Sequence, residues 1–213
     1  MIYNLETAKI TARYLLQIKA IKINPAKPFT WVSGWKSPIY CDNRKTLSYP
    51  AIRTYLRQEF VKCISDELTT PEVIAGVATG GIPHGVLVAH DLGLPFIYVR
   101  TEAKGHGLNN KIEGEVEKGK NVIIIEDLIS TGKSSYNVVE AVLNAGCKVV
   151  GMIAIFSYGF DIAHNKFKDI KCPLYTLSDY NTVIDVAVEN GLIPDEYLNT
   201  LKEWRKTPDT WGQ

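Results

Sequence analysis

The stretch from Asn121 to Ser135 constrains the fold of this chain more than any other. Val122 to Ile125 is an uninterrupted run of β-branched residues, which is typical of a strand buried on both faces of a parallel sheet. Two carboxylates, Glu126 and Asp127, follow at the point where we expect that strand to leave the sheet. The pattern therefore predicts an α/β fold with acidic side chains at the carboxyl end of a central strand.

A turn of small, mostly hydroxylated residues joins this strand to a helix predicted from about Tyr136 to just before Gly146. Backbone N–H groups at a helix start lack partners and lie at the positive end of the helix dipole, so such a turn suits a phosphate. Lys133 and the hydroxyl groups add further donors. The acid pair would repel a phosphate and suits ribose hydroxyls, a Mg²⁺ ion or a developing cation beside it. The sequence thus predicts a sugar-phosphate site.

Two other interpretations of this stretch compete with that one. A nucleoside-triphosphate P-loop needs a glycine five positions before Gly132, and Asp127 stands there, which excludes it. An ordinary strand–turn–helix connection with a solvated acid pair stays open at this point, because capping hydroxyls at helix starts are common.

Length and charge narrow the class of protein. The 213 residues suffice for one well-buried α/β domain with an appendage, which we expect as a hood over about 1–45 and a core over about 46–213. A formal net charge of +1 provides no field that would recruit nucleic acid or an anionic membrane. The longest apolar run, Val149 to Phe156, is far shorter than the roughly 20 residues that span a bilayer.

Cysteine usage points to the cell interior. The four cysteines show no Cys-x-x-Cys spacing, and the first residues do not resemble a signal peptide. Reduced thiols in a cytoplasmic protein are the simplest account. The four histidines have no metal-ligand spacing with the cysteines, so a structural zinc is not expected.

The N-terminal part predicts a helix that Asn4 caps and that ends at about Ala20. The segment 23–43 then lacks hydrophobic periodicity and is rich in proline and aromatic residues, which favours an irregular cap over the opening of a ligand-binding site. A surface hairpin packed on the first helix is an equally weighted alternative. A second helix follows from Pro50 to about Leu68. The candidate anion contacts near the cap are Lys22, Lys36, Arg44 and Lys45.

The remainder predicts a Rossmann-like central parallel sheet of about five strands with crossover helices. The expected strands cover 73–77, 96–99, 122–125, 149–155 and 174–177. Ligands of such sheets collect at the carboxyl ends of the strands. Thr79-Gly80-Gly81 ends one strand and forms a second candidate anion cradle, since glycine lets backbone N–H groups curl around an oxyanion. Two cradles on neighbouring strands suggest a ligand with phosphates at both ends.

The connection from Arg100 to Gly119 is long and rich in glycine, which is typical of a lid. Its cations Arg100 and Lys104, together with His106, would complement a pyrophosphate when the lid closes. Closure would also keep water from a reactive sugar cation. The alternative is a solvated β-hairpin of mixed charge.

These motifs together resemble a known family. Glu126-Asp127-x-x-Ser130-Thr131-Gly132-x-Ser134 after an apolar strand resembles the ribose-phosphate signature of the type I phosphoribosyltransferases. The segments 100–107, 29–40 and 110–114 resemble the mobile catalytic loop and other motifs of the orotate branch. The resemblance covers nearly the whole chain.

The resemblance implies the type I phosphoribosyltransferase fold and a reaction. An enzyme of this branch transfers the phosphoribosyl group of 5-phosphoribosyl 1-pyrophosphate (PRPP) to orotate. The products are orotidine 5′-monophosphate and pyrophosphate, in de novo pyrimidine (UMP) biosynthesis. It further implies a Mg²⁺ cofactor held mainly by substrate oxygens, and a homodimer in which the lid reaches the partner's site. No nucleic-acid or membrane partner is expected.

The resemblance also assigns residues. Asp127, Glu126 and Lys104 would be catalytic, the two acids would hold the ribose hydroxyls, Ser130 would touch orotate, and Lys22 is a further candidate contact. The implied PRPP-binding set is Arg100, Lys104, His106, Glu126, Asp127, Leu128, Ile129, Ser130, Thr131, Gly132, Lys133 and Ser134.

Three positions depart from the family pattern. Thr101 and Gly80 stand where many relatives have basic residues. Phe156 to Gly159 replaces an Asp-Arg pair whose arginine binds the orotate carboxylate, so backbone N–H groups or the N-terminal cap would have to meet that group. Two alternatives remain: a purine or other base phosphoribosyltransferase of the same fold, and a PRPP-sensing regulator that binds RNA or DNA.

Overall fold

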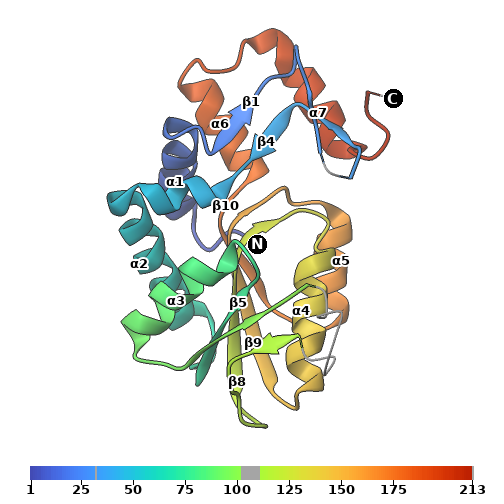
Figure 1. Ribbon diagram of the computed structural model, residues 1–213. Coiled ribbons are helices and arrows are strands. Elements are labelled where there is room, and N and C mark those ends of the chain that lie inside the picture. Colours follow the sequence, from blue (N-terminus) through green and yellow to red (C-terminus); the bar gives the residue numbers. More distant parts are fainter. Residues whose placement is uncertain (32, 102–110, 213) are drawn as a thin grey trace.

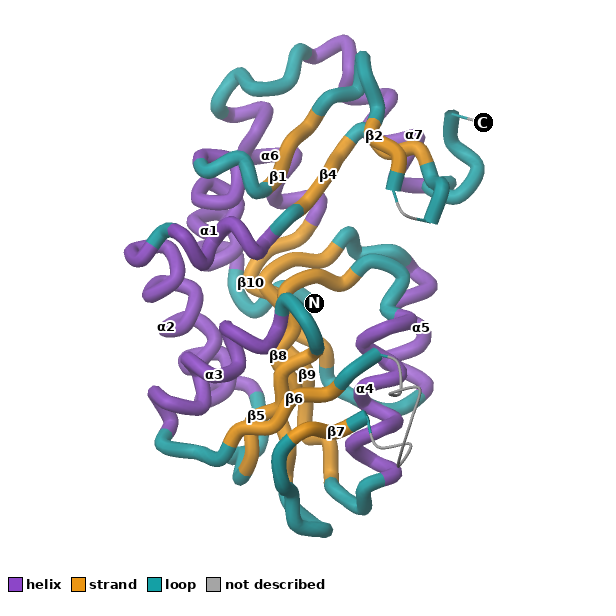
Figure 2. Tube along the Cα trace, viewed as in Figure 1, coloured by secondary structure: helices purple, strands orange, loops and turns teal. Residues whose placement is uncertain are grey.

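The computed structural model describes residues 1–31, 33–101 and 111–212. Its centre is a six-stranded sheet in the order β10-β9-β8-β5-β6-β7 (Figure 2). The bounds are β5 Val73–Val77, β6 Phe96–Val99, β7 Ile112–Glu113, β8 Asn121–Ile129, β9 Lys148–Ser157 and β10 Leu174–Asp179. The five predicted strands are present and parallel. β7 is an added antiparallel edge strand on β6, within a connection that we expected to lack regular structure.

Both faces of this sheet are covered, which explains the uninterrupted apolar run in β8. Ile123 and Ile125 belong to one core cluster, whereas Val122 and Ile124 belong to another on the opposite face. Successive side chains of a strand point to opposite faces, so a strand covered on both sides needs apolar residues at every position.

The helices form two outer layers (Figure 1). α1 (Leu5–Gln17), α2 (Pro50–Glu67) and α3 (Gly81–Leu92) cover one face, and α4 (Lys133–Asn144) and α5 (Asp161–Asp169) cover the other. The predicted cap of the first helix is confirmed, since Asn4 Oδ1 accepts a hydrogen bond from the Thr7 N–H at 2.8 Å. α1 ends at Gln17, earlier than the predicted Ala20.

The hood is more regular than expected. β1 (Ile21–Ile23) pairs with β4 (Ile39–Cys41), and β2 (Phe29–Thr30) pairs with β3 (Lys36–Ser37), both antiparallel. The short 3-10 helix η1 (Asn43–Ser48) then leads into α2. The irregular cap that the proline and aromatic content predicted is therefore two small sheets, because paired strands satisfy backbone groups that a buried irregular segment would leave without partners.

The C-terminal part lies beside the hood. It contains α6 (Tyr180–Glu189), the 3-10 helix η2 (Asp195–Tyr197) and α7 (Leu198–Lys206). Trp204 of α7 is fully buried, and its indole N–H donates to the Lys36 carbonyl at 3.1 Å. Its ring packs against Trp31 and Tyr158. α7 therefore holds the hood against the end of β9.

In the described part of the chain, no helix combines the length and apolar character that crossing a membrane requires.

Candidate active site

The strand that carries the acid pair is longer than predicted. β8 continues to Ile129 rather than ending at Ile125, so Glu126 and Asp127 are strand residues. β9 stays paired with this extension, whereas the pairing with β5 ends at Gly76 opposite Ile125. The acid pair therefore projects beyond the end of β5, at the carboxyl edge of the sheet where ligands of α/β sheets bind.

The turn after β8 presents an open helix start. α4 begins at Lys133, three residues before the predicted Tyr136, and its N-cap is Gly132, which has a φ of +72° and provides no capping side chain. Only glycine adopts this backbone readily, and an added Cβ would also lie 3.2 Å from Ala163 Cβ. The N–H groups of the first turn receive no side-chain cap from the described residues and can serve an anion.

A second turn, between β5 and α3, faces the first. A Cβ on Gly81 would lie 2.3 Å from the Ile125 carbonyl oxygen, and one on Gly80 would lie 2.3 Å from Asp127 Cγ. Gly81 is therefore required by its close approach to the backbone of β8. A side chain at position 80 would meet only the Asp127 carboxylate and would displace it.

A cleft of about 410 Å³ lies between these turns and the hood. Three segments form it: the end of β4 with the start of η1, the β5–α3 turn, and the end of β8 with the start of α4. Its lining residues are Cys41, Asp42, Arg44, Val77, Ala78, Thr79, Gly80, Glu126, Asp127, Leu128, Ser130 and Ser134.

Five of the predicted site residues line this cleft, namely Glu126, Asp127, Leu128, Ser130 and Ser134. The others on the same segment lie beside it: Ile129 is fully buried in the core, and Thr131, Gly132 and Lys133 form the adjoining turn and helix start.

Of the predicted lid residues Arg100, Lys104 and His106, the structure describes only Arg100. Arg100 does not line the cleft. It directly follows β6, and its guanidinium Nη2 lies 3.1 Å from the carboxylate of Glu113 on the neighbouring strand β7. Lys104 and His106 lie outside the described residues. Lys22 is exposed on β1 and does not line the cleft either.

The sequence reasoning missed four of the residues that line the cleft, namely Cys41, Asp42, Val77 and Ala78. Arg44, a predicted anion contact, does line the cleft, and its Nε donates to Asp42 Oδ1 at 2.7 Å. This hydrogen bond lowers the pKa of Asp42 below its usual value. The signal that could have found Asp42 is its position two residues before the cation Arg44, directly after β4.

The acid pair is buried and held by hydrogen bonds. Glu126 is only 4% exposed, and its carboxylate accepts from the Asp127 N–H at 3.0 Å and from Ser135 Oγ at 2.9 Å. Burial, followed by the neighbouring Asp127 charge, raises the pKa of Glu126 well above its usual range. Burial also raises the pKa of Asp127. The carboxylates of Glu126 and Asp127 therefore hold protons more tightly than exposed carboxylates do.

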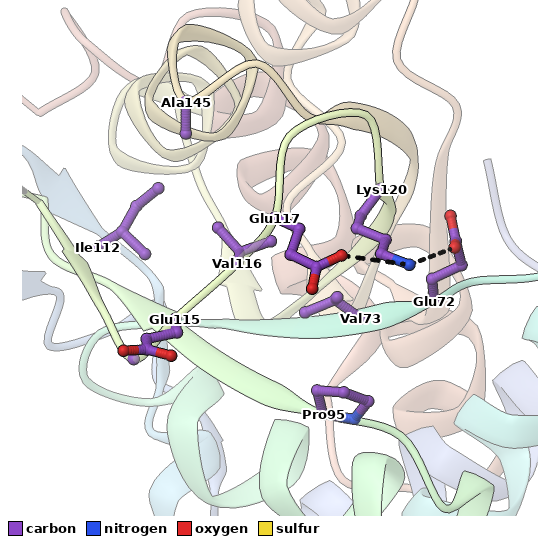
Figure 3. A pocket seen from close by; sticks show the side chains of 10 residues that line it. Glu72, Val73, Pro95, Ile112, Glu115, Val116, Glu117, Lys120 and Ala145 are labelled. Carbon is purple, nitrogen blue, oxygen red and sulfur yellow. Dashed lines mark hydrogen bonds and ion pairs between the residues drawn. The ribbon is translucent and has the colours of Figure 1, made fainter.

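A larger groove of about 690 Å³ lies at the opposite edge of the sheet, near the starts of β5 and β8 (Figure 3). Lys120 there pairs with Glu72 at 3.0 Å and Glu117 at 3.7 Å, and Glu115 also lines the groove. Carboxylates outnumber the cation here, as they do in the smaller cleft, where Asp42, Glu126 and Asp127 accompany Arg44. The smaller cleft differs in its position at the carboxyl edge of the sheet, beside the open start of α4, and this position favours it as the candidate active site.

Comparison with known proteins agrees with this geometry. The model of the phosphoribosyl transferase domain family matches residues 48–190. The chain is 54% identical to the orotate phosphoribosyltransferase of Bacteroides fragilis over 208 residues, 98% of this chain and 97% of the relative. The chain belongs to the orotate branch of the phosphoribosyltransferase family.

The same relationship holds for other members. The orotate phosphoribosyltransferase of Bacteroides thetaiotaomicron is also 54% identical over 208 residues, with 98% of this chain and 97% of the relative covered. The crystal structure of orotate phosphoribosyltransferase from Aeropyrum pernix superposes with a TM-score of 0.75 at 26% identity, covering 86% of this chain and 99% of that one. The family and fold that the motifs predicted are confirmed. The roles of single residues stay predictions.

In a phosphoribosyltransferase with this cleft, Gly80→Ala should lower turnover strongly and leave the fold intact. The added methyl group meets the short Asp127 side chain, and a displacement of about 1 Å at a reacting centre can cost about 100-fold in rate. Steady-state phosphoribosyl transfer and thermal unfolding would be measured together. Val86→Ala, on an exposed position of the same helix, is the control. Full activity of the glycine variant would contradict the proposed contact.

Glu126→Gln should stabilise the folded chain increasingly as the pH rises. Folding raises the pKa of Glu126, so its protonated form contributes stability below the unfolded pKa, and this contribution is lost as the pH rises toward the folded pKa. Glutamine stays neutral throughout, and Ser135 can reorient to accept from its amide.

The measurement is the melting temperature of both chains from about pH 5 to about pH 9, where each kcal/mol corresponds to roughly 2–4 °C. The melting temperature of the variant should exceed that of the wild type by an amount that increases with pH. Glu203→Gln, an exposed change on α7, should give no gap at any pH. A gap that narrows with rising pH would show that Glu126 is stabilised as a carboxylate.

Proposed function

We propose that this chain transfers the 5-phosphoribosyl group from PRPP to orotate, releasing pyrophosphate and forming orotidine 5′-monophosphate in pyrimidine biosynthesis. The observation that supports it is the cleft itself: two turns rich in backbone N–H groups face each other across a buried acid pair. PRPP has the matching chemistry, with phosphate at both ends and hydroxyl groups between them.

The turn from Leu128 to Ser134 holds the 5′-phosphate in this proposal. Its open helix start offers N–H groups, and the Ser130 and Ser134 hydroxyls line the same space. Glu126 and Asp127 hold the ribose 2′- and 3′-hydroxyls. The turn at Thr79 and Gly80 receives the pyrophosphate through its backbone, since glycine at position 80 offers no side chain.

The transfer breaks the C1′–oxygen bond to pyrophosphate and forms a C1′–nitrogen bond to the base. Positive charge develops on the ribose ring in this exchange, and negative charge develops on the departing pyrophosphate. The carboxylates beside the ribose are already in place to stabilise the positive charge on the ring. The N–H groups of the β5–α3 turn are in place to stabilise the negative charge on the pyrophosphate. Such preorganised electrostatic stabilisation is usually the largest single contribution to catalysis.

Mg²⁺ fits this cleft as an ion held mainly by oxygens of the substrate. Hard carboxylate oxygens line the cleft, but the described residues contain no group of three or more metal-ligating side chains. Mg²⁺ typically combines few protein carboxylates with substrate phosphates and water. When bound, the ion neutralises charge on the diphosphate.

Arg100, Lys104 and His106 complete the site in this proposal, as cations that reach the pyrophosphate from a lid. By the family resemblance, the lid of one protomer serves the site of the other in a homodimer. The ion pair between Arg100 and Glu113 has both side chains about one-third exposed, so substrate could draw the guanidinium away at modest cost. A cytoplasmic location also stays a prediction.

Orotate is the proposed base because the chain belongs to the orotate branch of the family. Ser130 is the proposed base contact, and Arg44 is the one cation among the described residues that line the cleft, so a base with a carboxylate would have to compete with Asp42 for its guanidinium. The segment Phe156 to Gly159 provides no cation: Tyr158 is buried, and Ser157 Oγ accepts from the Gly159 N–H.

The proposed function is tested by following orotate consumption spectrophotometrically, with PRPP and Mg²⁺ omitted in turn. Uracil, hypoxanthine and adenine are assayed in parallel, and transfer to a purine but not to orotate would favour a salvage enzyme. Asp127→Asn should remove most activity in a folded chain, because an amide is a weaker acceptor for the ribose hydroxyls. Wild-type turnover of this variant would refute the role of the acid pair.

Lys104→Ala should lower kcat far more than it weakens PRPP binding. In the proposed mechanism, the lysine charge is needed chiefly as the pyrophosphate leaves, so the interaction is stronger in the transition state than in the ground state. Steady-state kinetics and direct titration of PRPP separate the two effects. Lys171→Ala, just after α5, is the control. Equal losses of kcat and of affinity would contradict the lid role.

A further inference from the structure

The peptide groups of Asp127 are held by side chains rather than by a neighbouring strand. The register joins Glu126 and Leu128, on either side of it, to β9, whereas the pairing with β5 ends at Gly76, opposite Ile125. The Asp127 N–H donates to its neighbour Glu126, and its carbonyl accepts from the side-chain amide of Asn43. The direction of the Asp127 side chain therefore depends on these two contacts.

Asn43 is buried and its side-chain amide is held in one orientation. It is the first residue of η1 and only 1% exposed. The Cys41 thiol donates to Asn43 Oδ1 at 3.1 Å, which fixes that atom as the acceptor and turns Nδ2 toward Asp127. Burial raises the pKa of the Cys41 thiol well above its usual value, so the thiol keeps the proton that it donates.

The same short helix also reaches the other turn of the cleft. Thr46 Oγ1 donates to the Asn43 carbonyl at 2.6 Å, and the same oxygen lies 3.3 Å from Nε2 of His84. His84 is on α3, the helix that begins at Gly81. Burial lowers the pKa of His84 to about 4, so near neutral pH the ring is uncharged and donates from Nε2 to Thr46.

We propose that Asn43 is a positioning residue for phosphoribosyl transfer, which aims the Asp127 carboxylate by holding the Asp127 carbonyl and connects both anion-binding turns through η1. This rests on the proposed function. Asn43 is not among the residues that line the cleft, so it acts through Asp127 rather than on the substrate. Without its amide, the carbonyl is left without a donor, the end of β8 can rotate, and the ribose hydroxyls lose their acceptor geometry.

The charged and titratable groups around Asn43 come from three elements. They are Cys41, Asp42 and Arg44 on its own segment, Glu126 and Asp127 on β8, and His84 on α3. A carboxylate at position 43 would face the acid pair, which disfavours its ionised form and keeps its protonation within an accessible pH range. This allows a pH-dependent test.

The experiment compares kcat of Asn43→Asp and Asn43→Ala with wild type from about pH 6 to about pH 8.5. When ionised, the new carboxylate of the Asn43→Asp variant cannot donate, so this variant should lose about 10- to 100-fold at high pH, the usual scale for a lost buried hydrogen bond. Its protonated form restores an O–H donor, so its activity relative to wild type should recover as the pH falls. The alanine variant should show a similar loss that does not change with pH.

Asn190→Asp is the matched control, because the Asn190 side chain also donates to a backbone carbonyl, that of Val186, away from the cleft. Its relative activity should stay near wild type at every pH. Melting temperatures are recorded for all variants. A merely structural role would lower the melting temperatures of both Asn43 variants, and the kcat of each relative to wild type would then not change with pH.

The proposal would be overturned by wild-type kcat in either folded Asn43 variant at the high-pH end of the range. It would also be overturned if both variants had equal kcat ratios that do not change with pH and that follow a loss of melting temperature. If the aspartate variant does not fold, a folded alanine variant decides: reduced kcat supports the positioning role and wild-type kcat refutes it. The ratios are measured with whichever base the wild type uses, so failure of orotate as substrate refutes the proposed function without affecting this test.

Discussion

The close approach of the β5–α3 turn to the end of β8 is the constraint on which the rest of the cleft depends. The turn can lie there only because Gly81 leaves space where a Cβ would collide with the Ile125 carbonyl oxygen, and Gly80 leaves space for the Asp127 carboxylate. This approach places one set of backbone N–H groups beside the acid pair, while the turn around Gly132 places a second set on the other side. A side chain at position 81 would need a different course of the backbone, and one at position 80 would need a different direction of the Asp127 side chain.

The acid pair lowers the stability of the fold while serving the proposed reaction. Glu126 lies among apolar strand residues and its pKa is raised by burial, which means that its ionised form is costly in the folded state. A neutral residue would suit the core better. The carboxylates are retained where the ribose would lie, and fixed charge in a partly dehydrated cleft is what a developing sugar cation requires. The hydrogen bonds from Ser135 and the Asp127 peptide limit the cost.

The hood connects these parts. Its strands come from the N-terminal segment, yet Trp204 from α7 is buried against it, so both ends of the chain stabilise one side of the cleft. From this body η1 contacts β8 through Asn43 and α3 through Thr46. Glu126, Asn43 and His84 are all nearly inaccessible to solvent, so the positions of the cleft walls are set by buried polar contacts. Such networks specify one arrangement because an unmatched buried polar group is unfavourable.

The sequence by itself determined the parallel strands, the glycine turns at their carboxyl ends, the acid pair and the family, because residue type and local periodicity carry that information. It misjudged the end of β8 and the start of α4, since the continuing β9 partner, not local propensity, extends β8 to Ile129. Only the tertiary structure decided that β7 closes the sheet edge, that Asp42 enters the cleft, and that Asn43 holds Asp127 across 84 positions of sequence. Contacts of this kind depend on how separate elements pack, and no pattern within one segment specifies them.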